Sequence, residues 1–509
     1  MISNRVLNAK RNIFYGITNR CIMLLMPFFI RTVIIKQLGA DYLGLSSLFT
    51  SILQVLNLTE MGFSSAIIFS LYKPIAKGDV LVIRALMNMY RNVYKKIGIL
   101  ILIVGIIISI FLPHLIKGDC PKSINIYVIY WFYLINTAIS YLLYAYKSAL
   151  LIAHQRNDIE VNIITITNLL QYICQILVII ICKNFYLYVF FYIIFTIIGN
   201  LIRAYITTKK YPEYFCEGEL SAELKMDIKK RVSGAFIQKF CATARNSFDS
   251  IFLSMFLGLS VITIYGNYYY ILVAIHGVLL VIINGIDAGV GDSIARNSIK
   301  KNCYDMRKFT FMYAWLSGWS TVCLICLYQP FMEIWVGRKL MFPMSTVILF
   351  GIYFYILTIG DVRSSYITGA GLWWEGRYRA IVEAVVNLLL NYLLGKYFGV
   401  NGIIWATIIS IVVINFLWGN EILYKYYMKG EEKKIYYKEH IVYFLVTLIV
   451  TVISYRLCMY IIVPGIKGII IKAIIITSFS NTVFLFVYRK NDYWKESLKM
   501  VQNILRIKK

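Results

Sequence analysis

The sequence predicts an all-α membrane protein with about fourteen transmembrane helices. It predicts two parallel six-helix lobes around a central cavity, followed by two extra C-terminal helices. Three observations lead to this fold class. Of the 509 residues, 60% are hydrophobic, which exceeds the apolar share of about half in a soluble domain. Apolar runs of at least about 18 residues, enough to cross a bilayer, recur along the chain. The second half also repeats the pattern of the first.

The apolar runs are continuous, which favours helices over the short alternating strands of an outer-membrane barrel. Their boundaries are defined to within about 2 to 4 residues. The expected spans are 13–36, 43–70, 93–115, 124–148, 161–182, 186–206, 231–257, 261–286, 309–329, 343–369, 377–398, 402–424, 441–463 and 466–488.

The cationic residues set the expected orientation. About 36 of the 52 Lys and Arg residues fall on the side of the N-terminus and about 9 on the other, so both termini are expected in the cytoplasm. The net charge of +27 is therefore a topology signal and a match to anionic membrane lipids rather than a sign of nucleic-acid binding. In the basic tail, Trp494, Leu498, Val501 and Leu505 recur at helical spacing, which predicts an interfacial amphipathic helix.

Two short stretches reveal the repeat. NLTEMG (57–62) and NGIDAG (284–289) place Asn, an acid and Gly at the same offsets. Alignment on them also pairs the outer turns QLGADYLGLSSLF (37–49) and FLGLSVITIYGNYYY (256–270), and FLPHLIKG (111–118) with YQPFMEIWVG (328–337). Because each copy has an even number of spans, the copies enter the membrane from the same side.

This repeat predicts the domain organisation. Residues 1–210 form the N-lobe with helices 1 to 6, and residues 231–424 form the C-lobe with helices 7 to 12. Residues 211–230 are the cytoplasmic linker between the lobes. Residues 425–488 hold helices 13 and 14, and residues 489–509 are a basic, amphipathic cytoplasmic tail.

Cations inside spans are costly and mark candidate binding sites. Arg20 and Arg31 lie 11 residues apart in the first span, which puts them on nearly the same helix face and about 16 Å apart along the axis. Lys239 and Arg245 occupy the equivalent span of the second copy. Together they suit an extended polyanion, although snorkelling to the interface or pairing with Asp249 would also explain them.

A second set of polar residues suits coupling to a cation or a proton. Oxygen atoms of carboxylate, amide and hydroxyl groups favour Na⁺ or H⁺, whereas interhelical hydrogen bonding is the simpler explanation. The set comprises Asp249, Glu383, Asn387, Asn391 and Thr407. His276 is expected to be a hydrogen-bonded core residue rather than a proton shuttle.

Glu60 and Asp287 are the acids of the two repeated stretches. The span map places both near the cytoplasmic mouth, where they are expected to act as gate partners or anchors rather than substrate ligands. No catalytic constellation, Walker A sequence or firm metal site is present, so neither an enzyme nor a bound cofactor is expected.

The stretch QLGADYLGLSSLFTSILQVLNLTEMGFSSAI (37–67) resembles the corresponding region of polysaccharide-repeat flippases. These belong to the multidrug/oligosaccharidyl-lipid/polysaccharide exporter superfamily, and YQPFMEIWVG is similar as well. The resemblance implies that the protein moves an undecaprenyl-diphosphate-linked oligosaccharide across a bacterial inner membrane for O-antigen, capsule or other surface polysaccharide. It implies glycan polymerase and glycosyltransferases as partners.

The resemblance also assigns roles to residues. It implies diphosphate binding by Arg20, Arg31 and the cations of the seventh span. By similarity to lipid II flippases, Asp249, Asn387 and Thr407 match a Na⁺ site in which Asn391 replaces a second acid. Two alternatives remain open: a cation-coupled multidrug exporter of the same superfamily and a membrane enzyme of glycan assembly.

Overall fold

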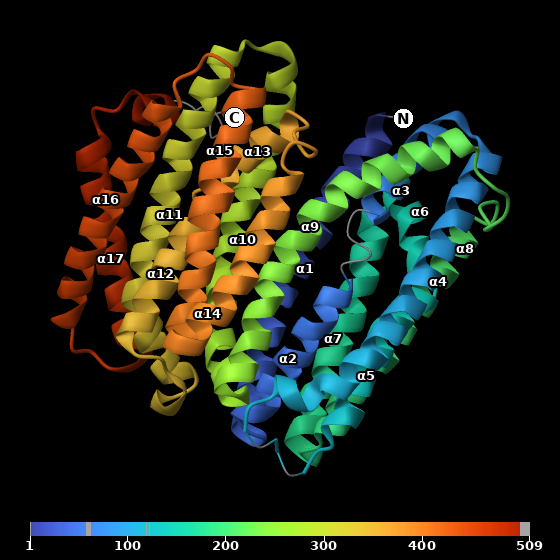
Figure 1. Ribbon diagram of the computed structural model, residues 1–509, viewed down its shortest axis with the longest axis horizontal. Coiled ribbons are helices and arrows are strands. Elements are labelled where there is room, and N and C mark those ends of the chain that lie inside the picture. Colours follow the sequence, from blue (N-terminus) through green and yellow to red (C-terminus); the bar gives the residue numbers. More distant parts are fainter. Residues whose placement is uncertain (1, 58–62, 119, 122, 499–509) are drawn as a thin grey trace. The chain divides into compact units, whose positions relative to one another are not determined.

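The computed structural model describes residues 2–57, 63–118, 120–121 and 123–498, and its regular elements are helices (Figure 1). The chain divides into two compact units, Met1–Thr263 and Ile264–Lys509. The first unit contains α1 (Ile2–Gln37), α2 (Ala40–Leu56), α3 (Phe63–Lys77), α4 (Val80–Phe111), η2 (Leu112–Leu115), α5 (Ile126–Leu142), η3 (Ala145–Lys147), α6 (Ser148–Ala153), α7 (Asn157–Cys182), α8 (Phe185–Lys210), α9 (Ala222–Leu257) and the start of α10 (Leu259–Arg296).

The second unit contains the rest of α10 and the later helices. These are α11 (Ile299–Trp335), η4 (Arg338–Leu340), α12 (Met344–Thr358), α13 (Asp361–Gly369), α14 (Arg377–Ile409), the π-helix η5 (Ser410–Trp418), α15 (Gly419–Tyr426), α16 (Lys433–Met459) and α17 (Gly465–Tyr488).

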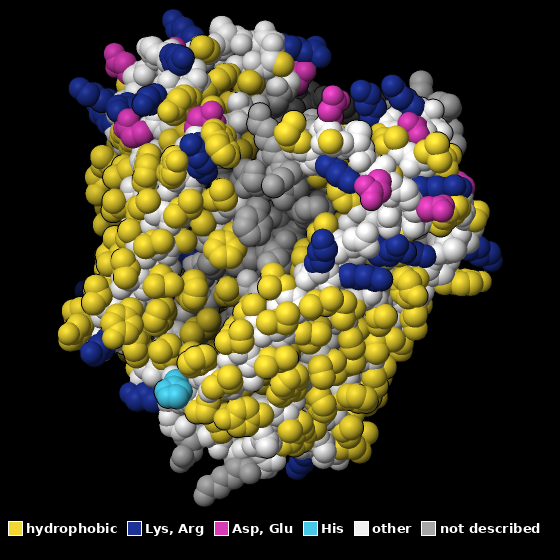
Figure 2. All heavy atoms as spheres, turned by 45° about the vertical axis from the view of Figure 1, so that its right-hand side comes forward, with side chains coloured by type: hydrophobic (Ala, Val, Ile, Leu, Met, Phe, Trp, Pro, Cys, Tyr) yellow, Lys and Arg dark blue, Asp and Glu magenta, His cyan; other side chains and the backbone are white. Residues whose placement is uncertain are grey.

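The helices confirm a multi-pass membrane protein. Among the described residues, ten segments are long and apolar enough to cross a membrane, or eleven with the bent pair Ile126–Leu142 and Ala145–Ala153. One of the ten, Arg377–Tyr426, is 50 residues long and covers two expected spans. Gly399 divides it, with a φ of 59°. Figure 2 shows hydrophobic side chains over broad areas of the visible face, with most charged side chains toward the upper end.

Several helices extend beyond the expected spans. α1 begins at Ile2 rather than near residue 13, and α11 covers Ile299–Trp335 rather than 309–329. Hydropathy marks only the part of a helix that lipid would cover, so it misses polar extensions. Conversely, the expected span 124–148 breaks after Leu142, where Tyr144 adopts a left-handed conformation with a φ of 56°.

Paired glycines support the repeat. α1 and α9 each end at a turn with a glycine of positive φ, Gly39 at 113° and Gly258 at 91°. The later pair of aligned stretches ends in Gly118 at 87° and Gly337 at 79°. Since only glycine adopts such conformations readily, these four positions show why the repeat preserves glycine at corresponding turns.

The starts of the repeat-equivalent helices α2 and α10 pack on each other. Thr263 Oγ1 donates to the carbonyl of Ala40 at 2.6 Å, and the Ser260 hydroxyl donates to Asp41. Gly44 makes this approach possible, because a Cβ there would overlap the carbonyl oxygen of Leu259.

Replacing Gly44 by Ala will therefore destabilise the first unit by about 2 kcal/mol, as expected for overpacking against backbone. Thermal unfolding of the purified protein measures this effect. Gly285→Ala is the matched control, because a Cβ at that helical position would meet no heavy atom of the described residues within 4 Å apart from the adjacent residues and backbone of its own helix. If both variants unfold at the same temperature, the close approach is not important for stability.

The segment after α8 is held against α4. Arg84 Nε donates to the carbonyl of Glu213 at 2.7 Å, and its guanidinium lies 3.7 Å from the ring centroid of Phe215. Asn88 Nδ2 donates to the carbonyl of Gly218 at 2.9 Å. α9 begins at Ala222, inside the expected linker, with the hydroxyl of Ser221 as its N-cap. The first half of the linker is therefore a packed part of the first unit.

His154 lies between two spans and stacks on Tyr211 with ring centroids 4.3 Å apart. Burial lowers the pKa of His154 from its ordinary 6.5, an effect that Glu213 opposes and Lys210 reinforces. The unfolded chain takes up the proton at the ordinary pKa while the folded chain keeps the ring neutral. Stability will therefore fall as the pH drops below about 6.5.

The His154→Gln variant tests this pH dependence. It will lose less thermal stability than the wild type between about pH 7.5 and pH 5.5. His114→Gln, at an exposed position, will behave like the wild type. Identical acid sensitivity of the His154→Gln variant and the wild type would contradict the role of this ring.

The C-terminal helices form an aromatic core with α11. α16 and α17 both pack on α11, around buried residues that include Phe311, Tyr443 and Phe484. The chain after α17 returns to this core: residues 492–498 are helical, and Trp494 stacks on Trp315 with centroids 4.8 Å apart. Residues 499–509, with Val501 and Leu505 of the predicted amphipathic helix, lie outside the described residues.

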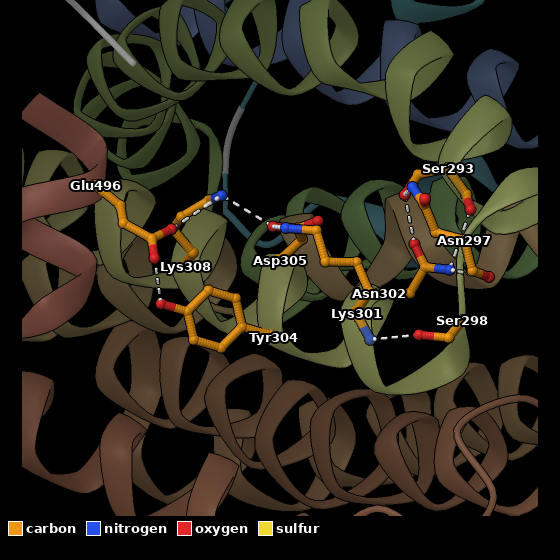
Figure 3. A network of polar contacts seen from close by, with 9 residues as sticks. All are labelled: Ser293, Asn297, Ser298, Lys301, Asn302, Tyr304, Asp305, Lys308 and Glu496. Atoms are coloured by element: carbon orange, nitrogen blue, oxygen red, sulfur yellow. Dashed lines mark hydrogen bonds and ion pairs between the residues drawn. The ribbon is translucent and has the colours of Figure 1, made fainter. Parts of the chain in front are cut away.

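Polar contacts fix the same tail segment (Figure 3). Glu496 accepts a hydrogen bond from the hydroxyl of Tyr304 at 2.7 Å and pairs with Lys308 at 3.5 Å. Lys308 also pairs with Asp305 at 2.8 Å. In the adjoining turn, Asn302 accepts from the hydroxyl of Ser293 at 2.6 Å. The start of the tail is thus bound to the N-terminal end of α11.

Candidate functional site

α1 carries the first pair of candidate ligands. Asn19 Nδ2 donates to Thr165 Oγ1 of α7 at 2.8 Å, and Asn168 of α7 approaches the sulfur of Met23 at 3.6 Å. Because Asn19 faces α7, the adjacent Arg20 points away from that contact and is exposed. Arg31 is half-buried on the same unbroken helix. The helix therefore presents two guanidinium groups on one face.

α9 carries the second pair of candidate residues. Arg245 and Asp249 lie one turn apart, and both are buried, with exposed fractions of 9% and 2%. The side chain of Lys239 lies outside the described part of the structure. α2 packs against both α1 and α9, so one helix positions the two cationic helices in the first unit.

In the second unit, three predicted coupling residues form a chain of hydrogen bonds. Asn391 Nδ2 donates to Asn387 Oδ1 at 3.2 Å, and Asn387 Nδ2 donates to Thr407 Oγ1 at 3.3 Å. All three side chains are buried, with exposed fractions of at most 1%. α14 supplies all three residues, and the break at Gly399 turns the chain back so that Thr407 faces Asn387. This arrangement concentrates neutral oxygen atoms in an apolar region.

Glu383 lies one turn before Asn387 but has a different set of partners. Its carboxylate pairs with Arg379 at 2.8 Å and accepts from Asn415 Nδ2 at 2.9 Å. Asn415 belongs to the π-helix η5, a feature often found at functional sites. Glu383 thereby links α14 to η5.

Arg363 is a central residue that sequence reasoning missed. It is 1% exposed, and its guanidinium donates to the carbonyls of Asn415 at 2.5 Å and Phe416 at 3.0 Å and to Asn415 Oδ1 at 2.7 Å. A Cβ at Gly419 would lie 2.5 Å from Arg363 Nη1, so glycine makes room for it. The one signal in the sequence that could have revealed Arg363 is its charge within the expected span 343–369. Its partners lie 52 and 53 residues later in the chain, so the sequence does not identify them.

His276 is hydrogen-bonded, as the sequence predicts. Its Nε2 lies 2.9 Å from Asp361 Oδ2, which also accepts from the hydroxyl of Tyr313 at 2.7 Å. These three residues join α10, α13 and α11. The ring of His276 is therefore a hydrogen-bonded part of the second unit.

Of the two repeated acids, the structure describes Asp287 but not Glu60. Glu60 lies outside the described residues, so its predicted role stays a prediction. Asp287 is exposed and lies inside α10, which continues to Arg296. Among the described residues, no group of three or more His, Cys, Asp or Glu side chains is placed to hold a metal ion.

The fold of this chain is shared with solved structures of membrane transporters. The chain is similar to the lipid II flippase MurJ in an inward closed conformation, with a TM-score of 0.68 and 14% identity over 95% of this chain and 99% of that one. An inward-facing multidrug resistance MATE family transporter of the MOP superfamily gives a TM-score of 0.57 and 14% identity over 80% and 97% of the two chains. A mutant of the Vibrio cholerae MATE transporter VcmN gives a TM-score of 0.56 and 14% identity over 84% of this chain and 99% of that one.

No model of a known protein family matches the sequence, and no curated protein matches it either. The likeness to solved structures establishes the fold that the sequence predicts.

Proposed function

We propose that this protein is a flippase for a lipid-linked, diphosphate-bearing oligosaccharide. Its substrate would be an undecaprenyl-diphosphate-linked repeat unit, moved from the inner to the outer leaflet of a bacterial inner membrane by alternating access. The observation that carries the proposal is the charge of α1, which contains six Lys or Arg residues and no Asp or Glu; three of the six, Arg20, Arg31 and Lys36, lie within the expected span 13–36. A cationic membrane helix suits an anionic substrate, because buried charge requires a partner of opposite sign.

Arg20 and Arg31 fit the two ends of such a headgroup. Their separation of about 16 Å along the helix exceeds the size of a diphosphate, so one guanidinium would bind phosphate while the other contacts charge or hydroxyls farther along the substrate. Arginine suits this role since its planar fork donates paired hydrogen bonds to phosphate oxygens. The polyprenyl tail would stay in the lipid, which avoids exposing its apolar surface to water.

Coverage of the similar structures supports a flippase over a drug exporter. The lipid II flippase matches 95% of this chain, whereas the two MATE transporters match 80% and 84%. A drug exporter for cationic compounds would also favour an acidic pocket, unlike the cationic α1. A membrane enzyme of glycan assembly would need side chains that are available to react with a substrate. The polar clusters described above instead hydrogen-bond or form ion pairs with one another, which favours a structural role for them.

The decisive experiment measures translocation directly. The purified full-length protein is placed in liposomes with a labelled undecaprenyl-diphosphate oligosaccharide, and exposure of the glycan on the opposite leaflet is followed with a membrane-impermeant glycosidase. We expect protein-dependent exposure. The absence of exposure, together with efflux of cationic drugs, would instead establish the exporter. Glycosyl transfer by the protein alone would establish the enzyme.

For cellular context, we propose that both termini are cytoplasmic and that glycosyltransferases and a polymerase act before and after this step. The glycan would be an O-antigen, capsule or related surface polysaccharide. A deletion strain should lose surface glycan and keep its resistance to drugs.

We also propose Na⁺ as the coupling ion, held by Asn387, Asn391 and Thr407. Asn391→Asp would add a negative charge to this site. Two unit charges 4 Å apart attract by about 4 kcal/mol at an effective dielectric constant of about 20, so the variant should bind Na⁺ at least about tenfold more tightly.

Sodium-dependent transport at several Na⁺ concentrations measures this change. Asn168→Asp, in the first unit at the position that the sequence repeat pairs with Asn387, is the control and should leave the Na⁺ dependence unaltered. Transport that follows the proton gradient alone in the wild type and in Asn391→Asp would rule out Na⁺ coupling.

A further inference from the structure

A cavity of about 200 Å³ lies in the first unit, away from the cationic face of α1. Its walls come from α4, η3, α6 and α8 and from the segment after α8, of which residues 211, 212 and 214–216 line the cavity. The span map places all of these segments on the cytoplasmic side. Its lining residues include Arg91, Lys147, Thr207, Tyr211, Phe215 and Cys216.

The polar groups of the cavity are two cationic side chains, which only donate hydrogen bonds, and several hydroxyls, which can donate as well as accept. Lys147 Nζ contacts the hydroxyl of Thr208, and Arg91 Nη2 donates to Asn88 Oδ1 at 2.8 Å. Arg91 Nε and Thr207 Oγ1 are buried and have no hydrogen-bond partner within the described part of the protein. Thr207 is only 1% exposed. Burying such groups without partners costs about 1 to 3 kcal/mol each, so the site is suited to an external acceptor.

The charge of the lining selects the sign of the ligand. Among the described residues that line the cavity, two are cationic and none is Asp or Glu. A compact oxyanion accepts hydrogen bonds on every face, and a phosphate group is the common one that pairs with Arg and Lys together. The volume of the cavity also favours a small ligand such as phosphate, because cavities for drug-sized ligands begin at about 300 Å³.

The site is also preorganised. Arg84 and Asn88 hold the segment from Glu213 to Gly218 against α4, as described above. This segment supplies one wall of the cavity, so the wall requires little ordering when a ligand binds.

We propose that this cavity binds a phosphate group from the cytoplasmic side. The group belongs either to the headgroup of an anionic inner-leaflet lipid or to a soluble phosphate compound. This site is separate from the proposed transport site on α1, and its occupant would add contacts to the first half of the lobe-joining linker, which already packs on the first unit.

Cys216 provides a reporter inside the cavity. The full-length protein is treated with a thiol-alkylating reagent, and modification is measured by peptide mass spectrometry, which separates Cys216 from the other cysteines. The probes are inorganic phosphate and dihexanoyl phosphatidylglycerol, with chloride as the ionic-strength control. At about ten times the dissociation constant, mass action predicts about tenfold slower alkylation of Cys216. The rate at the exposed Cys21 should not change.

Two variants test the cations. Arg91→Gln with Lys147→Gln should weaken protection at least about tenfold, since each charge-assisted hydrogen bond is lost. Lys95→Gln with Lys96→Gln removes two exposed cations from the same helix and should retain full protection. Thr207→Val removes only the hydroxyl and should also weaken protection, which keeps the test valid if the double variant does not fold.

The outcomes separate the two sources and can overturn the proposal. Protection by inorganic phosphate indicates a soluble ligand, and protection by the lipid alone indicates a headgroup. If neither probe slows alkylation, or if Arg91→Gln with Lys147→Gln and Thr207→Val are protected like the wild type, the cavity is not a phosphate site. Neither result depends on transport activity, so failure here leaves the proposed flippase function intact.

Discussion

Replacing Arg20 and Arg31 together by Ala should lower the rate of substrate translocation at least about a hundredfold, because hydrogen bonds made by a charged donor, to phosphate or to a hydroxyl, contribute about 1.5 to 3 kcal/mol each. The effect should be on transport and not on folding, since Arg20 is exposed and Arg31 is half-buried. The liposome assay measures the rate, and thermal unfolding confirms that the protein is intact.

Two further variants sharpen this prediction. Arg20→Lys with Arg31→Lys keeps the charges but loses the planar fork, so it should recover part of the rate. Lys434→Ala with Lys438→Ala removes two exposed cations at the start of α16 and should transport normally. If the double Ala variant translocates substrate at the wild-type rate, the diphosphate does not bind on α1.

Replacing Arg363 by Met should destabilise the second unit by about 3 to 5 kcal/mol, the usual cost of breaking a buried charged network. Met fills much of the volume, but it leaves the carbonyls of Asn415 and Phe416 without the donors that Arg363 supplies. It also removes a positive charge near Glu383. For a unit of this size the midpoint of thermal unfolding should fall by about 10 °C.

Arg296→Met is the matched control for this variant. Arg296 pairs with Asp292 at 2.7 Å, but its side chain is 75% exposed, and such surface pairs contribute at most about 1 kcal/mol. The two variants are compared by differential scanning fluorimetry in the same detergent. Equal midpoints would show that the guanidinium of Arg363 does not stabilise η5.

The sequence was sufficient for the fold class because hydropathy and the repeat are properties of the chain itself. The paired glycines at the turns, such as Gly39 and Gly258, are visible in the sequence as well. Charged partners are different, because their pairing depends on which helices meet. Arg363 and Asn415 lie on separate elements, and the sequence around either residue does not indicate that the two are in contact.

The candidate site shows the same division. The spacing of Asn387 and Asn391 on one helix is readable from the sequence, and the structure connects both to Thr407. The pairing of Glu383 with Arg379 also follows i, i+4 spacing, so it was accessible to sequence reasoning, whereas the bond from Asn415 was not. Helix ends outside the hydrocarbon region, such as the start of α9 at Ala222, carry no hydropathy signal at all.

The packing of α9 has a consequence for biosynthesis. α9 begins the second sequence copy, yet it packs against α2 and α3, and Lys117 ties its end through hydrogen bonds to the carbonyls of Ser254 at 3.0 Å and Phe256 at 2.6 Å. A nascent chain that has emerged only to residue 210 therefore lacks a helix that its first unit needs. Tertiary packing of the first unit would be completed only after Leu257 has been synthesised, so part of the second sequence copy is needed to finish the first unit.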